Sequence, residues 1–266
     1  MNPINRFLNK VVHRLMCCGT AYDIRRTTVR EINHAVQQNI LASRLNAKAF
    51  GEYAGMNRGR DMILFATGPS LNKFKPIDGC VKIGVNHAFL RVPDLDYFFA
   101  VDNKPLYPVA DQLFAYKGNN CVKFLGRSYS YLGSQEIIPE YMMEKAEARP
   151  FVVDAINIYG HPKSYFPLDI CTQPLFGGNS TVFPAMQFAL YTRPRKIYIV
   201  GCDCSAGGHF FTDNIHGGTF HAEAYERLTE SWKLLKAFAG EVYPDTQIVS
   251  VNPVGLKGLF EDLYQE

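Results

Sequence analysis

The chain has 266 residues, of which 47% are hydrophobic and 20% charged, which is enough for one sizeable core or for one domain with an appendage. Its net charge of +3 is too small to indicate a nucleic-acid-binding protein. No apolar run reaches the ~20 residues that are needed to span a bilayer.

The cysteines indicate whether the protein works in a reducing or an oxidising compartment. The seven cysteines are scattered, and two pairs are too close in sequence for an ordinary disulfide: Cys17, Cys18, Cys80, Cys121, Cys171, Cys202 and Cys204. This pattern favours a reducing cytosol. The apolar residues at the amino terminus are interrupted by Asn9, Lys10 and His13, which makes a poor signal peptide. We therefore expect a cytoplasmic protein, with the inner face of the membrane as the alternative.

Residues 1–56 form a basic segment that we expect to be helical, with a break near Gly19. Residues 1–60 hold ten Lys/Arg and three Asp/Glu, and apolar side chains recur at helical spacing from Val29 to Leu45. This stripe can pack on the main domain, pair with a second copy in a homo-oligomer, or lie on an anionic membrane surface as a peripheral contact. A solvated arm is the remaining alternative.

The main domain, residues 60–266, opens with a strand and a glycine turn. Five apolar residues, Met62 to Ala66, predict a strand that is buried on both faces. Gly68 lets the backbone turn sharply and approach a ligand, and Ser70 can accept hydrogen bonds from unpaired amides. A helix that begins there would present free N–H groups to an anion. The turn is either a phosphate or nucleotide site or an ordinary strand-to-helix turn.

Further strands and helices alternate along the chain. The expected strands are Cys80–Val85, Tyr97–Val101, Cys121–Leu125, Phe151–Val153, Lys196–Val200 and Gln247–Val251. The expected helices are Glu140–Ala148, Val182–Tyr191 and Ala222–Ala239. Residues 126–173 read mainly as an irregular insert, which is more often functional than idle. The fold class is α/β, with a Rossmann-like, mostly parallel sheet (a GT-A-like variant), a helical amino-terminal segment and a lid or insert.

Small polar residues follow each predicted strand or open the helix at Val182. They are Thr67, Gly68, Ser70, Asn86, His87, Asp102, Asn103, Gly177, Gly178, Asn179, Ser180, Thr181, Gly201 and Asp203. Because ligands bind at the carboxyl ends of parallel strands, these residues predict a nucleotide-type site at that edge.

A glycine-rich loop, residues 205–221, carries three histidines: His209, His216 and His221. Glycines suggest a loop that can close over a ligand, and histidine is the natural general base near neutral pH. The spacing lacks the i, i+4 geometry of a zinc helix, and Cys202 and Cys204 have no second thiol pair. We expect a catalytic histidine here and no metal site.

The order of several short motifs resembles that of the bacterial sialyltransferases of glycosyltransferase family 42. The motifs are Ala66-Thr-Gly-Pro-Ser-Leu71, Val85-Asn86, Gly178-Asn-Ser180 and Ile197-Tyr-Ile-Val-Gly-Cys-Asp203. They are also similar to a related family of unknown function that includes 6-hydroxymethylpterin pyrophosphokinase-like proteins. The resemblance covers residues 60–255, and the order and spacing of the motifs carry it.

The resemblance implies one Rossmann-like transferase domain with a lid, which uses a CMP-activated sugar without a required metal or cofactor. By position it places in the donor site Gly68, Ser70, Asn86, Asn103 (or Asp102), Asn179 and Ser180. It makes His221 the general base, with His216 in reserve. Where the family has two tyrosines that steady the leaving phosphate, this chain has Phe210 and Phe211. His209 or a backbone amide would have to substitute, since phenylalanine donates no hydrogen bond.

From the sequence we expect an inverting, metal-independent glycosyltransferase that moves a sugar from a nucleotide-activated, CMP-linked donor to a glycan or glycolipid acceptor. Asp94-Leu-Asp96 precedes a strand and makes a poor metal motif. One alternative is an ATP- and magnesium-dependent phosphotransferase in which Asp102 and Asp203 hold the metal. Another is a non-catalytic nucleotide-binding partner protein. No nucleic acid partner is expected.

Overall fold

A computed structural model describes most of the main domain and the end of the amino-terminal segment. The described residues are 29, 32–33, 36–128, 138–154, 166–178, 180–205, 208–210 and 222–265. Within them no helix is both long and apolar enough to cross a membrane.

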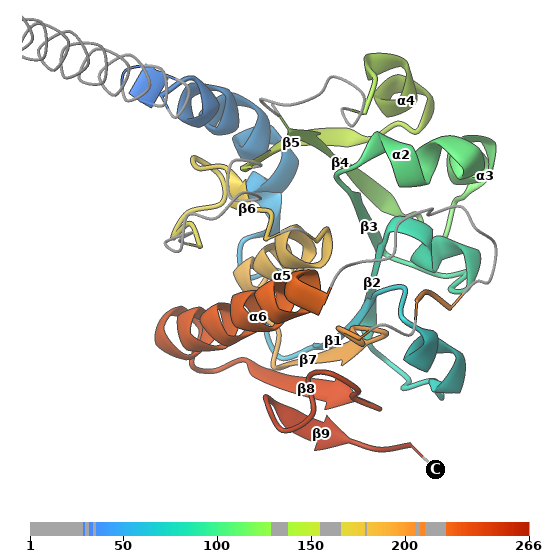
Figure 1. Cartoon of the computed structure of the whole chain (residues 1–266). Helices are drawn as coiled ribbons and strands as arrows, with labels where there is room; N and C mark the ends of the chain where they lie inside the picture. The colour runs from blue at the N-terminus through green and yellow to red at the C-terminus, as the bar shows by residue number, and fades with distance from the viewer. Residues whose placement is uncertain are drawn as a thin grey trace, which may run out of the picture.

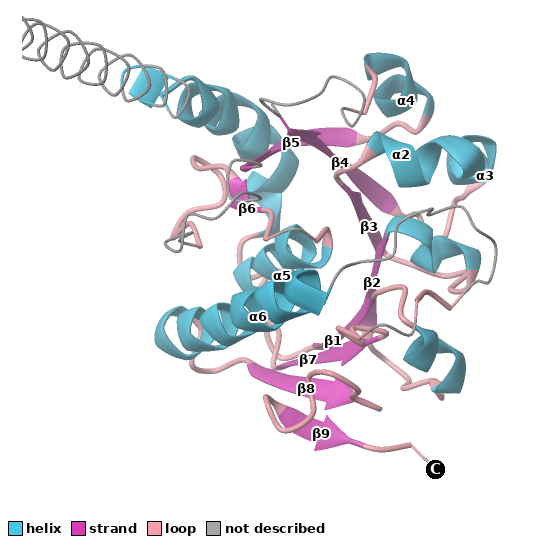
Figure 2. Cartoon of the chain, viewed as in Figure 1, coloured by secondary structure: helices cyan, strands magenta, loops and turns pink. Residues whose placement is uncertain are grey.

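The described residues form one sheet of nine parallel strands (Figures 1 and 2). The strands are β1 (Asp61–Phe65), β2 (Val81–Val85), β3 (Tyr97–Ala100), β4 (Val122–Ser128), β5 (Arg149–Asp154), β6 (Leu175–Phe176), β7 (Lys196–Val200), β8 (Gln247–Val251) and β9 (Glu261–Leu263). Every neighbouring pair in the sheet is parallel. The prediction of an α/β, Rossmann-like fold is confirmed.

The strand order contains a single reversal within this sheet, which runs β6-β5-β4-β3-β2-β1-β7-β8-β9. From β1 the chain adds strands on one side as far as β6, and then returns to place β7 on the free side of β1. In open parallel sheets, ligands bind outside the carboxyl ends of the strands at such a switch point. A ligand is therefore expected beside the carboxyl ends of β1 and β7.

Two layers of helices cover the sheet. Besides the helical residues 36–50, the described α-helices are α2 (Asn103–Leu106), α3 (Ala110–Ala115), α4 (Glu140–Lys145), α5 (Val182–Tyr191) and α6 (Ala222–Val242). The short 3₁₀ helices are η1 (Gly51–Tyr53), η2 (Pro69–Lys73), η3 (Asn86–Leu90) and η4 (Tyr107–Val109). Figure 1 shows α5 and α6 on one face, with α2, α3 and α4 on the other.

The two faces of β1 contribute to two separate cores. Met62 and Leu64 pack in the cluster that contains Trp232 of α6, whereas Ile63 and Phe65 pack in the cluster on the opposite face. All four β1 side chains are at most 2% exposed. Such burial on both faces explains why the strand reads as a continuous apolar run in the sequence.

Helical residues 36–50 join the amino-terminal segment to the sheet. Phe50 is fully buried against the rings of Phe99, Phe124, Phe151 and Phe188. Further from the domain the apolar stripe is exposed: Val29, Ile32, Val36 and Ile40 are each 48–57% exposed. The described part of the stripe is therefore not packed on the main domain, whereas the last turns of the helix are.

The segment 126–173 differs from the irregular insert expected from the sequence. It contains α4 and the six-residue β5, which pairs with β4 and β6 inside the sheet. Its described parts therefore belong to the sheet, and residues 129–137 and 155–165 lie outside the described residues. The strand predicted at Phe151–Val153 and the helix predicted at Glu140–Ala148 are both present, and the strand is longer than predicted because it begins at Arg149 and ends at Asp154.

Asn46 ties the amino-terminal helix to β5 and to the loop before β6. Its fully buried amide accepts a hydrogen bond from the Val152 N–H at 2.8 Å and donates one to the Gln173 carbonyl at 2.8 Å. Asn46→Ala leaves both backbone groups unpaired, and each costs about 1–3 kcal/mol. We expect the free energy of unfolding to fall by about 2–4 kcal/mol in urea titration. Lys48→Ala, an exposed change on the same helix, should stay within about 0.5 kcal/mol. Equal stability of the two variants would contradict this role.

Candidate functional site at the carboxyl edge of the sheet

Four neighbouring strands bring the predicted site residues to one edge. These strands lie side by side in the order β7-β1-β2-β3. Beyond their carboxyl ends come Asp203 after β7, Thr67 after β1, Asn86 after β2 and Asn103 after β3. All four strands are parallel, so their carboxyl ends meet at the same edge, about 4.8 Å apart from strand to strand. We call the polar edge formed after these strands the rim.

At the switch point, the ends of β1 and β7 are joined through Asp203. Its carboxylate accepts a hydrogen bond from the Ser70 N–H at 2.9 Å and another from the Ser70 hydroxyl. The two residues are only 7% and 6% exposed. We call this contact of Asp203 with Ser70 the joint. The Gly255 N–H donates to the Asp203 carbonyl at 2.7 Å, so the chain after β8 also contacts the joint. Asp203 thus works as the cap of η2 and holds three loops together.

A helix does begin at Pro69, but it is the five-residue 3₁₀ helix η2. The expectation that Ser70 accepts from free amides is wrong, because its N–H and its hydroxyl both donate to Asp203. The Gly68 N–H donates to the Gly201 carbonyl at 2.7 Å, and the Leu71 N–H to the Gly68 carbonyl at 3.0 Å. The turn is therefore not the expected cradle of free N–H groups, because its amides bind protein acceptors.

Gly68 is required for packing at this joint. A Cβ at this position would lie 2.6 Å from both the Asp203 Cγ and the Gly201 carbonyl oxygen. These distances are far inside van der Waals contact, so the close approach that the glycine permits is to Asp203 and not to a ligand. Gly201 itself has a φ of 71° and packs against the Ala66 carbonyl.

His209 is the member of the histidine loop that lies in the described part of the chain. Its Nδ1 is 2.9 Å from the Thr67 hydroxyl, directly after β1. Two backbone contacts of Phe210 fix the position: its N–H donates to the Thr67 carbonyl at 2.7 Å, and its carbonyl accepts from Asn72 Nδ2 at 3.2 Å. The loop thus reaches the rim at the switch point.

The protonation of His209 follows from its burial. Removal from water lowers the pKa of the imidazole below its ordinary value of 6.5, and a hydrogen bond to the Thr67 backbone opposes this change only in part. The ring is therefore neutral at physiological pH.

Asn86 links β2 to the start of α5. It has a φ of 51°, a left-handed conformation that asparagine tolerates better than most residues, and its Oδ1 accepts a hydrogen bond from the Thr181 hydroxyl at 3.1 Å. Thr181 is the N-cap of α5. The positive end of the α5 dipole therefore lies beside the end of β2.

The loop before α5 is shaped by Gly178 and Ser180. Gly178 has a φ of 51°, and a Cβ there would lie 2.5 Å from the Phe183 ring. The Ser180 hydroxyl accepts a hydrogen bond from the Val182 N–H at 3.4 Å. α5 has ten residues, but its first amides are used within the protein: Val182 and Phe183 donate to Ser180, and Pro184 has no N–H. This end therefore contributes its helix dipole to the rim and not free amides.

The end of β3 contributes Asp102 and Asn103. Asp102 is the N-cap residue of α2 and is half-buried, and Asn103 is the first residue of that helix. The Asn103 Oδ1 is buried and has no hydrogen-bond partner among the described residues. Such an acceptor usually has a partner in the working protein, and here a ligand on the rim can supply the donor.

The sequence reasoning did not select two polar residues that shape this edge. Buried Gln187 of α5 hydrogen-bonds Phe176 through both backbone groups, at 2.9 and 2.8 Å, and so holds β6 and the following loop. A single glutamine within an otherwise apolar helix was the available signal. Asn252, after β8, has a φ of 48° and a buried Nδ2 that lacks a partner among the described residues.

Three candidate residues, Asn179, His216 and His221, lie outside the described residues. The thiols beside the rim are protonated: burial raises the pKa of Cys204 to about 11 and that of Cys202 well above 9. Across the described ranges, no group of three or more His, Cys, Asp or Glu side chains is arranged to hold a metal ion. The described rim combines amide and hydroxyl groups with the carboxylates of Asp102 and Asp203, the amino terminus of α5 and the imidazole of His209.

No protein-family model matches the sequence, and no curated protein matches it significantly.

The position of His209 leads to a prediction about its titration. Because burial favours the neutral ring, the NMR chemical shift of its imidazole should titrate with a midpoint below 6.5. Because the pKa of His209 is lower in the folded than in the unfolded state, the residue stabilises the fold above pH 6.5. This stabilisation is lost as the pH falls through the folded-state pKa. His209→Gln should remove that acid dependence. A midpoint at or above 6.5 would show that the ring is solvated and not held against Thr67.

Proposed function

We propose that the protein is a glycosyltransferase that moves a sugar from a nucleotide-activated, CMP-linked donor to a glycan or glycolipid acceptor. The observation that carries the proposal is the joint placement, at the switch point of a parallel sheet, of a neutral histidine and an α-helix amino terminus. The resemblance of the motifs to bacterial sialyltransferases of glycosyltransferase family 42 supports the donor class.

In this proposal the donor phosphate lies at the amino terminus of α5, and not at the turn after β1. The α5 dipole favours the negative charge that grows on the leaving phosphate, and Asn86 and Ser180 flank this position. Asn103 Oδ1 accepts a hydrogen bond from the donor, for example from a ribose hydroxyl. These groups are held in place before the substrate binds, so little reorganisation is needed during the reaction.

A histidine removes the proton of the acceptor hydroxyl as that oxygen attacks the anomeric carbon, and one direct displacement inverts the configuration. His209 is held ready for this role because its ring is neutral and fixed by Thr67. His221, with His216 in reserve, is the base that the resemblance assigns. In that case, His209 is positioned to contact the leaving phosphate, where the related family uses tyrosine.

The geometry favours this reaction over magnesium-dependent phosphoryl transfer. Asp102 follows β3 and Asp203 follows β7, which are three strand spacings apart, or about 14 Å. Ligands of one Mg²⁺ each lie about 2.1 Å from the ion, so these two carboxylates are too far apart to share it. Asp203 is also fully engaged by Ser70. The mechanism we propose uses no metal.

The exposed stripe of the amino-terminal helix supports a contact outside the catalytic domain. Val29, Ile32, Val36 and Ile40 are about half exposed on one stripe. Apolar stripes of this kind on helices pair with a second copy or lie on a membrane surface. Either contact would suit a transferase that acts on glycolipids at the inner face of the membrane.

A thermal-shift panel of CMP, UDP, GDP and ADP tests nucleotide binding. CMP should raise the melting temperature most, since a ligand at 100 times its dissociation constant adds about 2.7 kcal/mol of stability. Asn86→Ala should abolish the shift. Asn120→Ala is the matched control, because Asn120 also has a left-handed φ, 53°, but is exposed. Loss of the shift in both variants, or no shift with any nucleotide, would contradict the proposed site.

Turnover then separates the remaining alternatives. The proposal predicts sugar transfer from a CMP-linked donor in the presence of a chelator. It also predicts that either His221→Ala or His209→Ala lowers the rate by about 10²–10⁴-fold, the usual effect of losing a general base. Magnesium-dependent turnover of ATP would favour the phosphotransferase. Tight nucleotide binding without turnover of any donor would indicate a non-catalytic partner protein.

A further inference from the structure

The connections that leave β1 and β2 are too short to cover the sheet. Fifteen residues, 66–80, join β1 to β2 and contain only η2, and residues 86–96 join β2 to β3 and contain only η3. In doubly wound folds an α-helix normally packs at each such crossover. Here the sheet face below these connections has a hollow instead.

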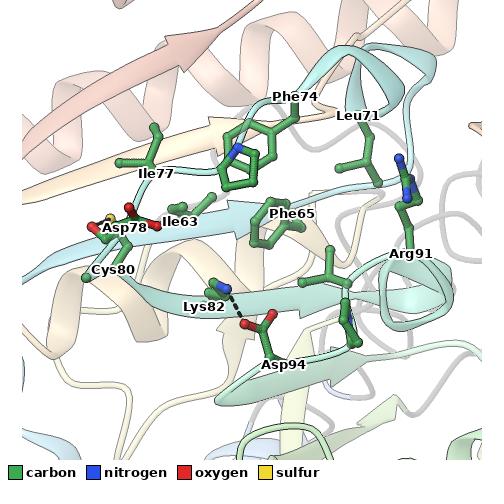
Figure 3. A pocket seen from close by; sticks show the side chains of 14 residues that line it. Ile63, Phe65, Leu71, Phe74, Ile77, Asp78, Cys80, Lys82, Arg91 and Asp94 are labelled. Carbon is green, nitrogen blue, oxygen red and sulfur yellow. Dashed lines mark hydrogen bonds and ion pairs between the residues drawn. The ribbon is translucent and has the colours of Figure 1, made fainter.

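This hollow is a pocket of about 350 Å³ (Figure 3). Ile63 and Phe65 of β1 form its floor, the chain from Leu71 to Cys80 forms one wall, and residues 91–94 form the other. The pocket lies along the face of the sheet, from Lys82 near the start of β2 to Arg91 beyond its end, and none of the rim residues Thr67, Asn86, Asn103 and Asp203 lines it. Its volume lies within the range of about 300–1,000 Å³ that is typical of small-molecule sites.

The middle of the pocket is apolar. Phe65 and Phe74 meet edge to face with ring centroids 5.2 Å apart, and Leu71, Ile77 and Val92 also line the pocket. Ile63 and Phe65 are at most 2% exposed, so most of the apolar surface that a ligand can touch comes from the half-buried Phe74 and Ile77. Such a surface binds a flat ring or a short hydrocarbon chain.

Charged groups are distributed unevenly around this apolar centre. Lys82 and Asp94 form an ion pair with each other. Arg91 lies at the end of the pocket near Leu71, and its guanidinium is exposed and has no ionic partner among the described residues (Figure 3). Asp78 lies at the opposite end, where it disfavours a second negative charge.

We propose that this pocket binds a small amphipathic monocarboxylate, with its ring or chain against Phe74 and Ile77 and its carboxylate on Arg91. Arginine offers a planar pair of N–H donors that matches a carboxylate. One acidic group at one end fits the pocket, because the other end carries Asp78 and the Lys82–Asp94 pair is already neutralised. The binding is independent of the nucleotide site.

Calorimetric titration with 2-naphthoate and its neutral counterpart, 2-naphthamide, tests the proposal. The two probes share the ring and differ in charge. We expect one molecule of 2-naphthoate to bind per chain, at least tenfold more tightly than 2-naphthamide. Arg91→Gln should remove this difference and leave 2-naphthamide binding unchanged. Arg44→Gln, an equal change of charge at an exposed position of the amino-terminal helix, should change nothing.

A second variant fills the pocket. Ile77 is half-buried on the pocket wall, so Ile77→Trp can place its indole ring in the hollow and should abolish binding of both probes. Thermal melting confirms that each variant is folded. Equal binding of the two probes to the unaltered protein, unchanged preference in Arg91→Gln, or no binding of either probe would overturn the proposal.

Discussion

The hydrogen bonds between Asp203 and Ser70 are the constraint on which the functional edge depends. They join the carboxyl ends of β1 and β7, which are adjacent only because the strand order reverses between them. A buried carboxylate is tolerated when hydrogen bonds replace its water, and here one residue supplies two. The joint requires glycine at position 68, because a side chain there would collide with Asp203.

This joint determines which groups remain for a ligand. The amides of Gly68 and Ser70 are used within the protein, so the turn after β1 is a structural element. The groups available for chemistry lie on either side of it. On one side Thr67 holds His209, and on the other Asn86 leads to the amino terminus of α5.

Much of the fold could be predicted because apolar runs mark the buried elements. The bounds of α5, β7 and β8 agree with those predicted from the sequence. β6 and β9 were not predicted, since two or three residues are too few to show a periodicity. The sequence also predicted which polar residues follow the strands and that they lie at one edge, because strands of a parallel sheet end at a common edge. The partners of those residues were not, since they depend on which strands are neighbours.

The glycine turn shows this limit clearly. A strand, a glycine, a proline and a serine predict either an anion site or a packed turn, and no local feature separates the two. Only the position of β7 beside β1 shows that Asp203 takes the place that a phosphate was expected to occupy. The resemblance to sialyltransferases depends on the order of such motifs, and it remains a hypothesis about the donor.

Hydrogen–deuterium exchange with saturating CMP tests most directly the claim that the rim binds a nucleotide. Bound nucleotide should slow amide exchange most strongly at residues 86–90 and 180–186, around Asn86 and the first turn of α5. Residues 74–80, which line the separate pocket, should show the smaller change that follows from global stabilisation alone. Strongest protection at residues 74–80, or no local protection at the ends of β2 and the start of α5, would contradict the account.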